Sequence, residues 1–554
     1  MELDSFHYTQ IFNINHIQIK IPSTYKQAIN SEHREHWIKA MDREYYSITN
    51  NQTYDLVPLP RDVQPIGCRW VYNIKHDPSG NYRFKARLVA QGYTQRYGVD
   101  FDKTYAPTAR LSSLRILLNM AVQYDFVIHH CDVDNAYLNS DIDRNDIYMK
   151  QPPGYETDDN LVCRLNKSLY GLKQSAHLWN NVLISFMTSQ NLEQSVCDPC
   201  VFVRITKSSV LYVLIWVDDL LIFASSIKIM EEFKSNFKSK FKIKDLGQAA
   251  WFLGIQIRIE PNLISLNQTL YIQNILKRFN MYDATPRTLP CDQSIYNLVA
   301  KDSQKLKNIK HYQEILGCLI YLMTVTRPDI TFVTIFLSKF MQNPTIIHLN
   351  LPRNVLKYLK YTINYDQNFV KSKTPLSIFG YTDSDFGSDV MDRRSFTGYA
   401  FHLNPVSALI SWKTGKQSIV ASSSCEAEYM ALHEATCEAL YLREFFYELT
   451  RQPKKPIPIF IDNQGAKELA LRPQYHKKTK HIPVKFHAVR KNILDKKISL
   501  AYNPTGDNIA DLFTKPMSNY KFQHFSAIRG QMNRCKIKKS KQKKVRKRKL
   551  KDFR

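Results

Sequence analysis

The chain has 554 residues, of which 44% are hydrophobic and 12% aromatic, so it can fill several packed cores and is not a disordered protein. Its 77 Lys and Arg residues against 50 Asp and Glu give a formal net charge of +27, which favours a polyanionic partner such as nucleic acid or an anionic membrane surface. Residues 536–554 hold 12 Lys or Arg and one Asp, but the remaining chain is basic as well.

The ten cysteines are scattered, and the first residues lack the charged-then-apolar pattern of a secretory signal, so we expect a reducing, intracellular setting. Cys197 and Cys200 form a CxxC pair without a second pair at ligand spacing. We therefore expect ordinary cysteines in a loop rather than a zinc site.

The first half of the chain mixes helical and strand periodicities. In order, the pattern predicts a helix at 24–50, a basic two-stranded hairpin at 66–93, a helix at 111–126, a strand running into a turn at 127–139 and a helix at 168–189. Because these elements do not alternate as regular βαβ units, they favour an α+β fold.

Residues 210–226 place two adjacent carboxylates, Asp218 and Asp219, between two apolar runs. The stretch is shorter than the roughly 20 apolar residues of a bilayer span, and central charges would be costly there. We predict a buried β-hairpin with both acids at its tip. From this stretch alone, an ordinary turn and a functional acid pair both stay open.

A third acid is available on the strand predicted at 127–139. Phosphoryl transfer with two divalent metals needs a few carboxylates that meet in space. Asp132 and Asp134 are two residues apart and therefore share a strand face, so either could point at Asp218.

After about residue 294 the pattern is mostly helical, and strands return near residue 376. The pattern then predicts strands at 376–386, 395–404 and 408–414, a helix at 425–448, and a strand at 457–461 followed by a helix. This is a compact α/β order. We place domain borders near residues 294 and 375.

Acids recur on four elements of this C-terminal unit. Asp383 ends a strand, Glu428 lies in a helix, Asp462 follows a strand, and Asp511 lies in the segment DNIADLFTK. Such acids could converge on two Mg²⁺ ions and activate a water against an RNA phosphate. The neighbouring rivals are Asp385, Glu426 and Asp507.

Several blocks together resemble a known family. The blocks are, in order, DVDNAYLN, IYMKQPPGY, LNKSLYGLKQSAHLWN, WVDDLLIF and KDLGQAAWFLGIQI. They resemble the reverse transcriptase of copia-type (Pseudoviridae) long-terminal-repeat retrotransposon Pol polyproteins. RSFTGYAF and ISWKTGKQSIVASSS resemble the ribonuclease H domain of the same family. The resemblance extends over residues 21–516.

The resemblance implies a multidomain α+β chain, in which a right-hand polymerase with fingers, palm and thumb is followed by an α/β ribonuclease H-like domain. The expected parts are an N-terminal extension at 1–20, the polymerase at 21–293, a mostly helical connection at 294–375, the ribonuclease H-like domain at 376–516, and a basic tail at 517–554.

The resemblance also implies roles for single residues. Asp132 and Asp218 would bind metal, with the Val133 carbonyl helping and Asp219 completing the pair. Among the nuclease acids, the motif match favours Asp383, Glu428, Asp462 and Asp511 as catalytic and metal-binding residues. The implied cofactor is Mg²⁺, two ions in each active site, with Mn²⁺ as a substitute.

Five residues would bind the incoming nucleotide. Lys85 and Arg87 would contact its triphosphate, although alternating basic residues also fit a solvated strand face. Tyr137 would lie beneath the sugar and exclude ribonucleotides, although it also fits a packed strand aromatic. Gly171 would allow close approach of template or nucleotide, and Gln174 would line the same surface. The chain has Ser-Ala after Gln174 where the family usually has Ala-Pro.

The expected function is therefore RNA- and DNA-directed DNA synthesis with ribonuclease H activity. Its partners would be an RNA template, a DNA primer or cDNA, the RNA–DNA hybrid and dNTPs, with no membrane. The alternative is an inactive relic that only binds nucleic acid, and the intact acids favour the enzyme. Neither a protease turn nor zinc-spaced His and Cys pairs of an integrase are present.

The chain resembles the C-terminal portion of a longer polyprotein. We expect it in a cytoplasmic virus-like particle with other products of that polyprotein. The tail at 536–554 would serve either as a nuclear import signal, which its compact KKVRKRK cluster favours, or as an arm that binds nucleic acid. His476, His481 and His487 are expected in a basic helix that follows a loop.

Overall fold

The computed structural model describes residues 11–14, 17–61, 63–76, 82–144, 146–297, 303–472, 484–528 and 531–533. Within these ranges, no helix combines the length and the hydrophobicity that a membrane crossing requires. The expected N-terminal extension and basic tail lie mostly outside the described residues, as do His476 and His481.

An N-terminal unit combines three small sheets with two helices. The hairpin β4–β5 confirms the prediction at 66–93, and the helix predicted at 24–50 is divided into α1 and α2. Trp37 of α2 packs edge-on against Phe84 of β5, with 4.5 Å between ring centroids. The elements are β1 (Ile11–Ile14), β2 (Ile17–Lys20), α1 (Tyr25–Ile29), α2 (Arg34–Asn50), β3 (Tyr54–Pro58), β4 (Cys68–His76), β5 (Tyr82–Ala90), β7 (Tyr148–Met149) and β8 (Leu161–Leu165).

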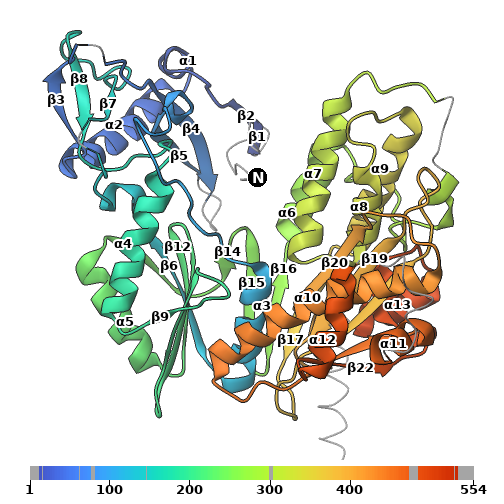
Figure 1. Cartoon of the computed structure of the whole chain (residues 1–554). Coiled ribbons are helices and arrows are strands. Elements are labelled where there is room, and N and C mark those ends of the chain that lie inside the picture. The colour runs from blue at the N-terminus through green and yellow to red at the C-terminus, as the bar shows by residue number, and fades with distance from the viewer. Residues whose placement is uncertain are drawn as a thin grey trace, which may run out of the picture.

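A six-stranded antiparallel sheet follows, in the order β13-β6-β12-β11-β10-β9. Helices α4 and α5 cover one face and α3 lies on the other (Figure 1). Because β11 and β12 are buried on both faces, their sequences are continuous apolar runs. The elements are α3 (Leu111–Tyr124), β6 (Val127–Val133), α4 (Ser175–Ser189), β9 (Glu193–Gln194), β10 (Val201–Ile205), β11 (Val210–Trp216), β12 (Asp219–Ala224), α5 (Ile227–Lys240) and β13 (Ile243–Gln248).

Short helices and loops join these layers. Cys197 and Cys200 lie in the loop between β9 and β10, as expected. The helix predicted at 168–189 begins only at Ser175, because residues 168–174 form a turn around Gly171. Two 3₁₀ helices are η2 (Gly92–Thr94) and η3 (Ala136–Asn139).

A second sheet, β14-β15-β16-β17-β23, stands beside a helical region. Its strand β17 falls within the segment expected as a helical connection and pairs with β16, for example Phe369 with Ile264. Strand pairing therefore crosses the border expected near residue 294. The elements are β14 (Trp251–Phe252), β15 (Ile255–Glu260), β16 (Leu263–Asn267), α6 (Thr269–Arg278), η4 (Gln293–Asn297), α7 (Ile309–Val325), η5 (Pro328–Ile330), α8 (Thr331–Ser338), α9 (Ile346–Tyr361), β17 (Tyr365–Val370) and β23 (Gln531–Asn533).

The C-terminal sheet has the order β20-β19-β18-β21-β22. Strands β18, β19 and β20 pair antiparallel to one another, and β21 and β22 run parallel to β18. The predicted strand at 457–461 coincides with β21. The elements are β18 (Phe379–Asp385), β19 (Phe396–His402), β20 (Ser411–Lys416), α10 (Ser424–Thr450), β21 (Ile457–Ile461), α11 (Gln464–Leu471), η7 (Val484–His487), α12 (Ala488–Leu494), β22 (Ile498–Tyr502), η8 (Thr505–Asp507), η9 (Ile509–Phe513) and α13 (Asn519–Ile528).

Polar contacts join α3 of the six-stranded sheet unit to α7 and to the C-terminal sheet unit. The buried Arg115 of α3 donates to the backbone carbonyl of Val325, at 2.8 Å, and to that of Ile410. The Tyr441 hydroxyl of α10 lies 3.0 Å from that of Ser113. In Figure 1, α10 runs along the base of the molecule, from which the N-terminal unit rises on one side and α6 to α9 on the other.

Candidate active sites

The predicted hairpin carries the first group of acids. Strands β11 and β12 are joined at Trp216 and Asp219, so Val217 and Asp218 form a two-residue turn. Asp219 lies directly opposite Asp132 of β6. The backbone N–H of Val133 donates to the Asp218 carbonyl at 2.8 Å. Backbone pairing therefore brings Asp132, Asp218 and Asp219 to one end of the sheet.

The turn itself is in a strained conformation. Val217 has φ +59°, a left-handed conformation that is unfavourable for a β-branched residue. The Trp179 indole N–H of α4 donates to the Val217 carbonyl at 2.7 Å. This contact anchors the turn to α4, so the position of Asp218 depends on α4 as well as on the hairpin.

The three carboxylates differ in their surroundings. Asp219 bonds to His130 Nε2 at 2.8 Å, and Lys244 Nζ lies 3.2 Å from Asp132 while also contacting Asp134. Burial raises the pKa of Asp218, and the charges of Asp219 and Asp132 raise it further. This mutual repulsion favours a cation between them.

The second group of acids is more compact. Asp383 in β18, Asp462 after β21 and Asp511 in η9 each place a carboxylate oxygen within 4.8 Å of the others. Within the described part of the chain, no other three acid, His or Cys side chains converge in this way. Asp383 and Asp511 are almost completely buried.

Glu428 of α10 completes this group. One of its oxygens accepts from the Ser384 backbone N–H at 3.2 Å. The other, Oε2, is buried and accepts no hydrogen bond from any residue that the structure describes. Burial raises the pKa of Glu428 well above its usual value, and Asp383 and Asp462 add to the effect.

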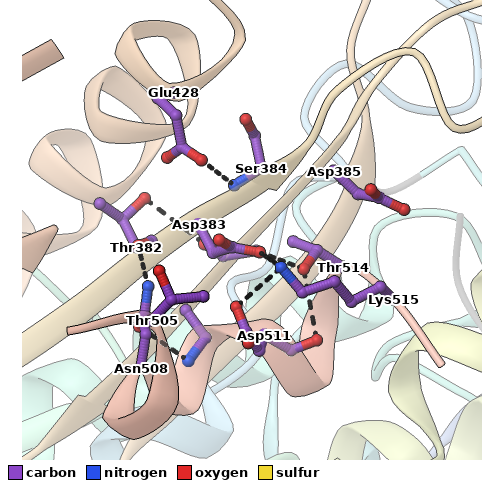
Figure 2. A network of polar contacts seen from close by, with 12 residues as sticks. Thr382, Asp383, Ser384, Asp385, Glu428, Thr505, Asn508, Asp511, Thr514 and Lys515 are labelled. Atoms are coloured by element: carbon purple, nitrogen blue, oxygen red, sulfur yellow. Dashed lines mark hydrogen bonds and ion pairs between the residues drawn. The ribbon is translucent and has the colours of Figure 1, made fainter. Parts of the chain in front are cut away.

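Cations and a hydroxyl hold these acids (Figure 2). Lys515 Nζ lies 3.0 Å from Asp511 Oδ1 and 3.5 Å from Asp383 Oδ2, and the Thr514 hydroxyl donates to Asp383. Burial raises the pKa of Asp383 to about 7, with Asp511 contributing and Lys515 opposing. Converging carboxylate oxygens, one of them buried without a partner, are a donor set that fits Mg²⁺.

The rival acids have other contacts. Asp385 accepts from the Tyr296 hydroxyl at 2.7 Å. Glu426 accepts from the Ser422 backbone N–H at 2.7 Å, close to the start of α10. Asp507 lies exposed in η8. The structure therefore brings together the four acids that the motif match favours.

Comparison with known proteins identifies the family of this chain. The family model "Reverse transcriptase (RNA-dependent DNA polymerase)" matches residues 51–293. The Retrovirus-related Pol polyproteins from transposon TNT 1-94 of Nicotiana tabacum and from transposon RE1 of Arabidopsis thaliana are 35% and 36% identical over 91% and 92% of this chain. The putative transposon Ty5-1 protein YCL074W of Saccharomyces cerevisiae is 32% identical, and the match covers 99% of it and 55% of this chain.

The chain belongs to the copia-type retrotransposon Pol family. It spans 38% and 35% of the two plant polyproteins, about a third of their length. Among solved structures, RNase H1 from Halobacterium salinarum matches 25% of this copia-type chain and 93% of its own, at 16% identity and a TM-score of 0.17. A score this low does not establish a shared fold.

In this copia-type chain, two residues expected at the nucleotide, Arg87 and Tyr137, gather around Tyr170 near the hairpin. The Arg87 guanidinium lies 4.8 Å from the Tyr170 ring centroid, and the Tyr137 ring lies 4.7 Å from the same centroid. The charge of Arg87 lowers the pKa of Asp218, against the larger effect of burial. Lys85 lies on the same half-buried face of β5 as Arg87.

Gly171 and Gln174 have internal contacts. Gly171 has φ +94°, and a Cβ there would lie 2.1 Å from the Ala90 carbonyl oxygen. The Gln174 side chain is fully buried, accepts from Gln95 at 3.2 Å and donates to the Asp100 carbonyl at 3.0 Å. The structure therefore does not bring Gln174 to the surface beside the acids.

Sequence reasoning missed several residues of both sites. Tyr170 lies within the block LNKSLYGLKQS, but nothing in that block indicates that its half-buried ring lies between Arg87 and Tyr137. Lys515 follows Asp511 by four residues, which is a recognisable helical ion-pair spacing. His487, which was expected in a basic helix, lies instead in η7 directly before α12, and its ring lies 3.3 Å from the Tyr429 hydroxyl.

Proposed function

We propose that this chain is an RNA- and DNA-directed DNA polymerase with ribonuclease H activity, which copies retrotransposon RNA into cDNA and degrades the RNA of the hybrid. One observation supports it above all others. In a chain of a reverse transcriptase family, Asp219 of β12 faces Asp132 of the paired strand β6, and Asp218 lies next to Asp219 in the turn that joins β11 to β12.

In the polymerase site, Asp132 and Asp218 hold two Mg²⁺ ions, for which Mn²⁺ can substitute. When bound, the metal stabilises the charge of the phosphoryl group. Val133 contributes its carbonyl oxygen. Asp219 completes the acid pair, and its contact with His130 holds its carboxylate in position. Lys85 and Arg87 bind the triphosphate. The Tyr137 ring, supported by Tyr170, lies beneath the sugar and excludes a 2′-hydroxyl.

In the proposed right-hand arrangement, the N-terminal unit corresponds to the fingers, the six-stranded sheet to the palm, and the second sheet with its helices to the thumb and connection. Gly171 keeps β5 close to the loop ahead of α4, since a Cβ there would collide with Ala90. We propose that Gln174 acts through this loop rather than by direct nucleotide contact.

In the nuclease site, Asp383, Glu428, Asp462 and Asp511 bind divalent metal and orient a water toward an RNA phosphate. Support comes from the convergence of three of these acids and from the buried, unpartnered Oε2 of Glu428, within the described residues. The basic chain holds the phosphates of the hybrid in a salt-dependent way that is largely independent of sequence.

Primer extension tests the proposal. A DNA primer is annealed to an RNA template labelled at its 5′ end, so that extension and template cleavage are followed in one reaction with Mg²⁺. Asp218→Asn should reduce extension by about 10³-fold and leave cleavage intact, because it removes one metal-binding carboxylate from the polymerase site alone. Asp134→Asn is the matched control, since Asp134 lies two residues after Asp132 and contacts Lys244 of β13, and it should extend normally.

Loss of both activities in the unmodified chain would contradict the proposal. A folded chain that binds the hybrid but neither extends the primer nor cleaves the template would be an inactive nucleic-acid-binding relic.

We further propose that the chain works in a cytoplasmic virus-like particle beside other polyprotein products, and that its basic tail directs nuclear import. Deletion of residues 536–554, with localisation and RNA affinity both measured, tests the role of the tail.

A further inference from the structure

The nuclease acids share an internal cation. Lys515 Nζ contacts both Asp383 and Asp511, which come from β18 and η9 (Figure 2). Among the cations that the structure describes, no other is within ion-pair distance of two of the four acids. Lys521 Nζ contacts Asp511 Oδ2 and the Thr505 carbonyl. Lys515 therefore links strand β18 to the 3₁₀ helix η9, whereas Lys521 contacts one acid.

The environment makes this link energetically important. The side chains of Asp383 and Asp511 are 2% and 0% exposed, and a buried carboxylate without a compensating charge is strongly unfavourable. Asp462 and Glu428 add negative charge to the same small volume. Without a metal, one ammonium between two carboxylates reduces the repulsion that would otherwise separate them.

The same ammonium competes with a divalent metal. A metal held by Asp383 and Asp511 would take up the carboxylate oxygens that Lys515 contacts, and two cations are not stable at that distance. The Lys515 side chain is 31% exposed, so its long aliphatic part allows the ammonium to turn toward water.

We propose that Lys515 is a positioning residue, an internal counter-ion that holds Asp383 and Asp511 together before divalent metal binds and leaves when it does. This inference rests on the proposed nuclease function and deepens it, because it makes the metal affinity of the site a balance between Lys515 and the metal.

A buried aspartate elsewhere in the chain provides the control. Asp389 is also fully buried and is held by Lys339 at 2.8 Å and by Lys416 at 2.6 Å. Asp389 does not belong to the converging group of acids in the described residues. Lys339→Met should therefore destabilise the protein to the same extent with and without metal, as an ordinary buried ion pair does.

The test measures Mn²⁺ binding and thermal unfolding. Full-length chains carrying Asp218→Asn, which weakens metal binding at the hairpin equally in every sample, are prepared with Lys515, Lys515→Met, Lys515→Arg or Lys339→Met. Free Mn²⁺ is followed by its paramagnetic resonance signal during titration, and the unfolding midpoint is recorded in EDTA and in Mn²⁺. Lys515→Gln replaces Lys515→Met if the latter does not fold.

Lys515→Met should lower the unfolding midpoint in EDTA, recover most of the loss in Mn²⁺, and bind Mn²⁺ about tenfold more tightly. Lys515→Arg, which keeps the charge, should resemble the unmodified site. Suppose that the chain with Lys515 binds Mn²⁺ and cleaves the hybrid. An unchanged Mn²⁺ affinity in Lys515→Met, or a loss of its Mn²⁺ binding, would then overturn the inference. Absence of both properties in the chain with Lys515 would instead overturn the proposed nuclease function.

Discussion

The two groups of acids are built in different ways. At the hairpin, the Asp132 and Asp219 side chains are 31% and 28% exposed, and their positions follow from strand register. At the second site, Asp383 and Asp511 are 2% and 0% exposed, and they meet because a strand and a 3₁₀ helix pack together.

The difference shows how a fold can present the same chemistry at different energetic cost. A partly exposed carboxylate, such as Asp132 or Asp219, retains part of its hydration, so its partners contribute little to stability. A buried carboxylate depends on its partners for solvation. We therefore expect substitutions at the hairpin to affect mainly activity, and substitutions at the buried site to affect activity and stability together.

The largest expected effect is a loss of hybrid cleavage at the buried site while primer extension at the hairpin continues. Glu428→Gln removes a carboxylate that faces Asp383 and Asp462, and it should reduce hybrid cleavage by about 10³-fold while primer extension continues. Template cleavage and extension are measured in the same reaction. Glu426→Gln is the matched control on the same helix turn, because Glu426 bonds to Ser422, and it should cleave normally. Equal loss in both variants would indicate a general defect of α10 rather than a role in the site.

The second prediction concerns how the free energy of unfolding depends on pH at the buried site. Burial raises the pKa of Asp383 to about 7, above the unfolded value of 3.8, so the folded protein binds the proton more tightly. Stability in EDTA should therefore fall as pH rises from about 4 to about 7, by roughly 1–3 kcal/mol. Asp383→Asn should remove this dependence, as measured by urea unfolding at pH 5 and pH 8.

Asp389→Asn is the control for this pH effect. Burial alone would raise the pKa of Asp389, but Lys339 and Lys416 outweigh it and lower the pKa. The stabilisation from Asp389 is therefore present above the unfolded pKa and is lost only as pH falls below it. Asp389→Asn should destabilise the protein by similar amounts at pH 5 and pH 8. If Asp383→Asn behaves in the same way, Asp383 does not carry a raised pKa.

The smallest expected effect is at the hairpin. Lys244 is 51% exposed and pairs with Asp132 and Asp134. Lys244→Met should change the free energy of unfolding by less than about 0.5 kcal/mol, because exposed ion pairs contribute little. Urea unfolding in EDTA measures it beside Lys515→Met. A loss for Lys244→Met as large as that for Lys515→Met would contradict the contrast between the two sites.

Local patterns predicted much of the fold. The two apolar runs with Asp218 and Asp219 between them formed the hairpin, and the strand at 457–461 was found at its full length. Other elements depended on distant partners. Strand β22 (Ile498–Tyr502) was not predicted, because its alternation is weak and it forms by pairing with β21. Strand β17 was missed for the same reason, since it adds to β16 from across the expected border.

The candidate sites divide in the same way. Spacing put Asp132 and Asp134 on one strand face, and the family resemblance favoured Asp132. The register with β12 gives the physical reason, because Asp132 faces Asp219 whereas Asp134 lies beyond the end of β6. Gln174 shows the reverse case, since its place in a motif block gave no sign that its amide is buried against Gln95 and Asp100.

The sequence by itself determined the family, the order of the motif blocks and the acids available for chemistry, because these depend on residue identity and local spacing. Only the tertiary structure decided which acids converge, which are buried and which cation they share. Asp383, Asp462 and Asp511 are far apart in the chain, and their convergence depends on long-range strand pairing. The raised pKa of Asp383, and the need of Asp383 and Asp511 for Lys515, arise from the burial that this packing creates.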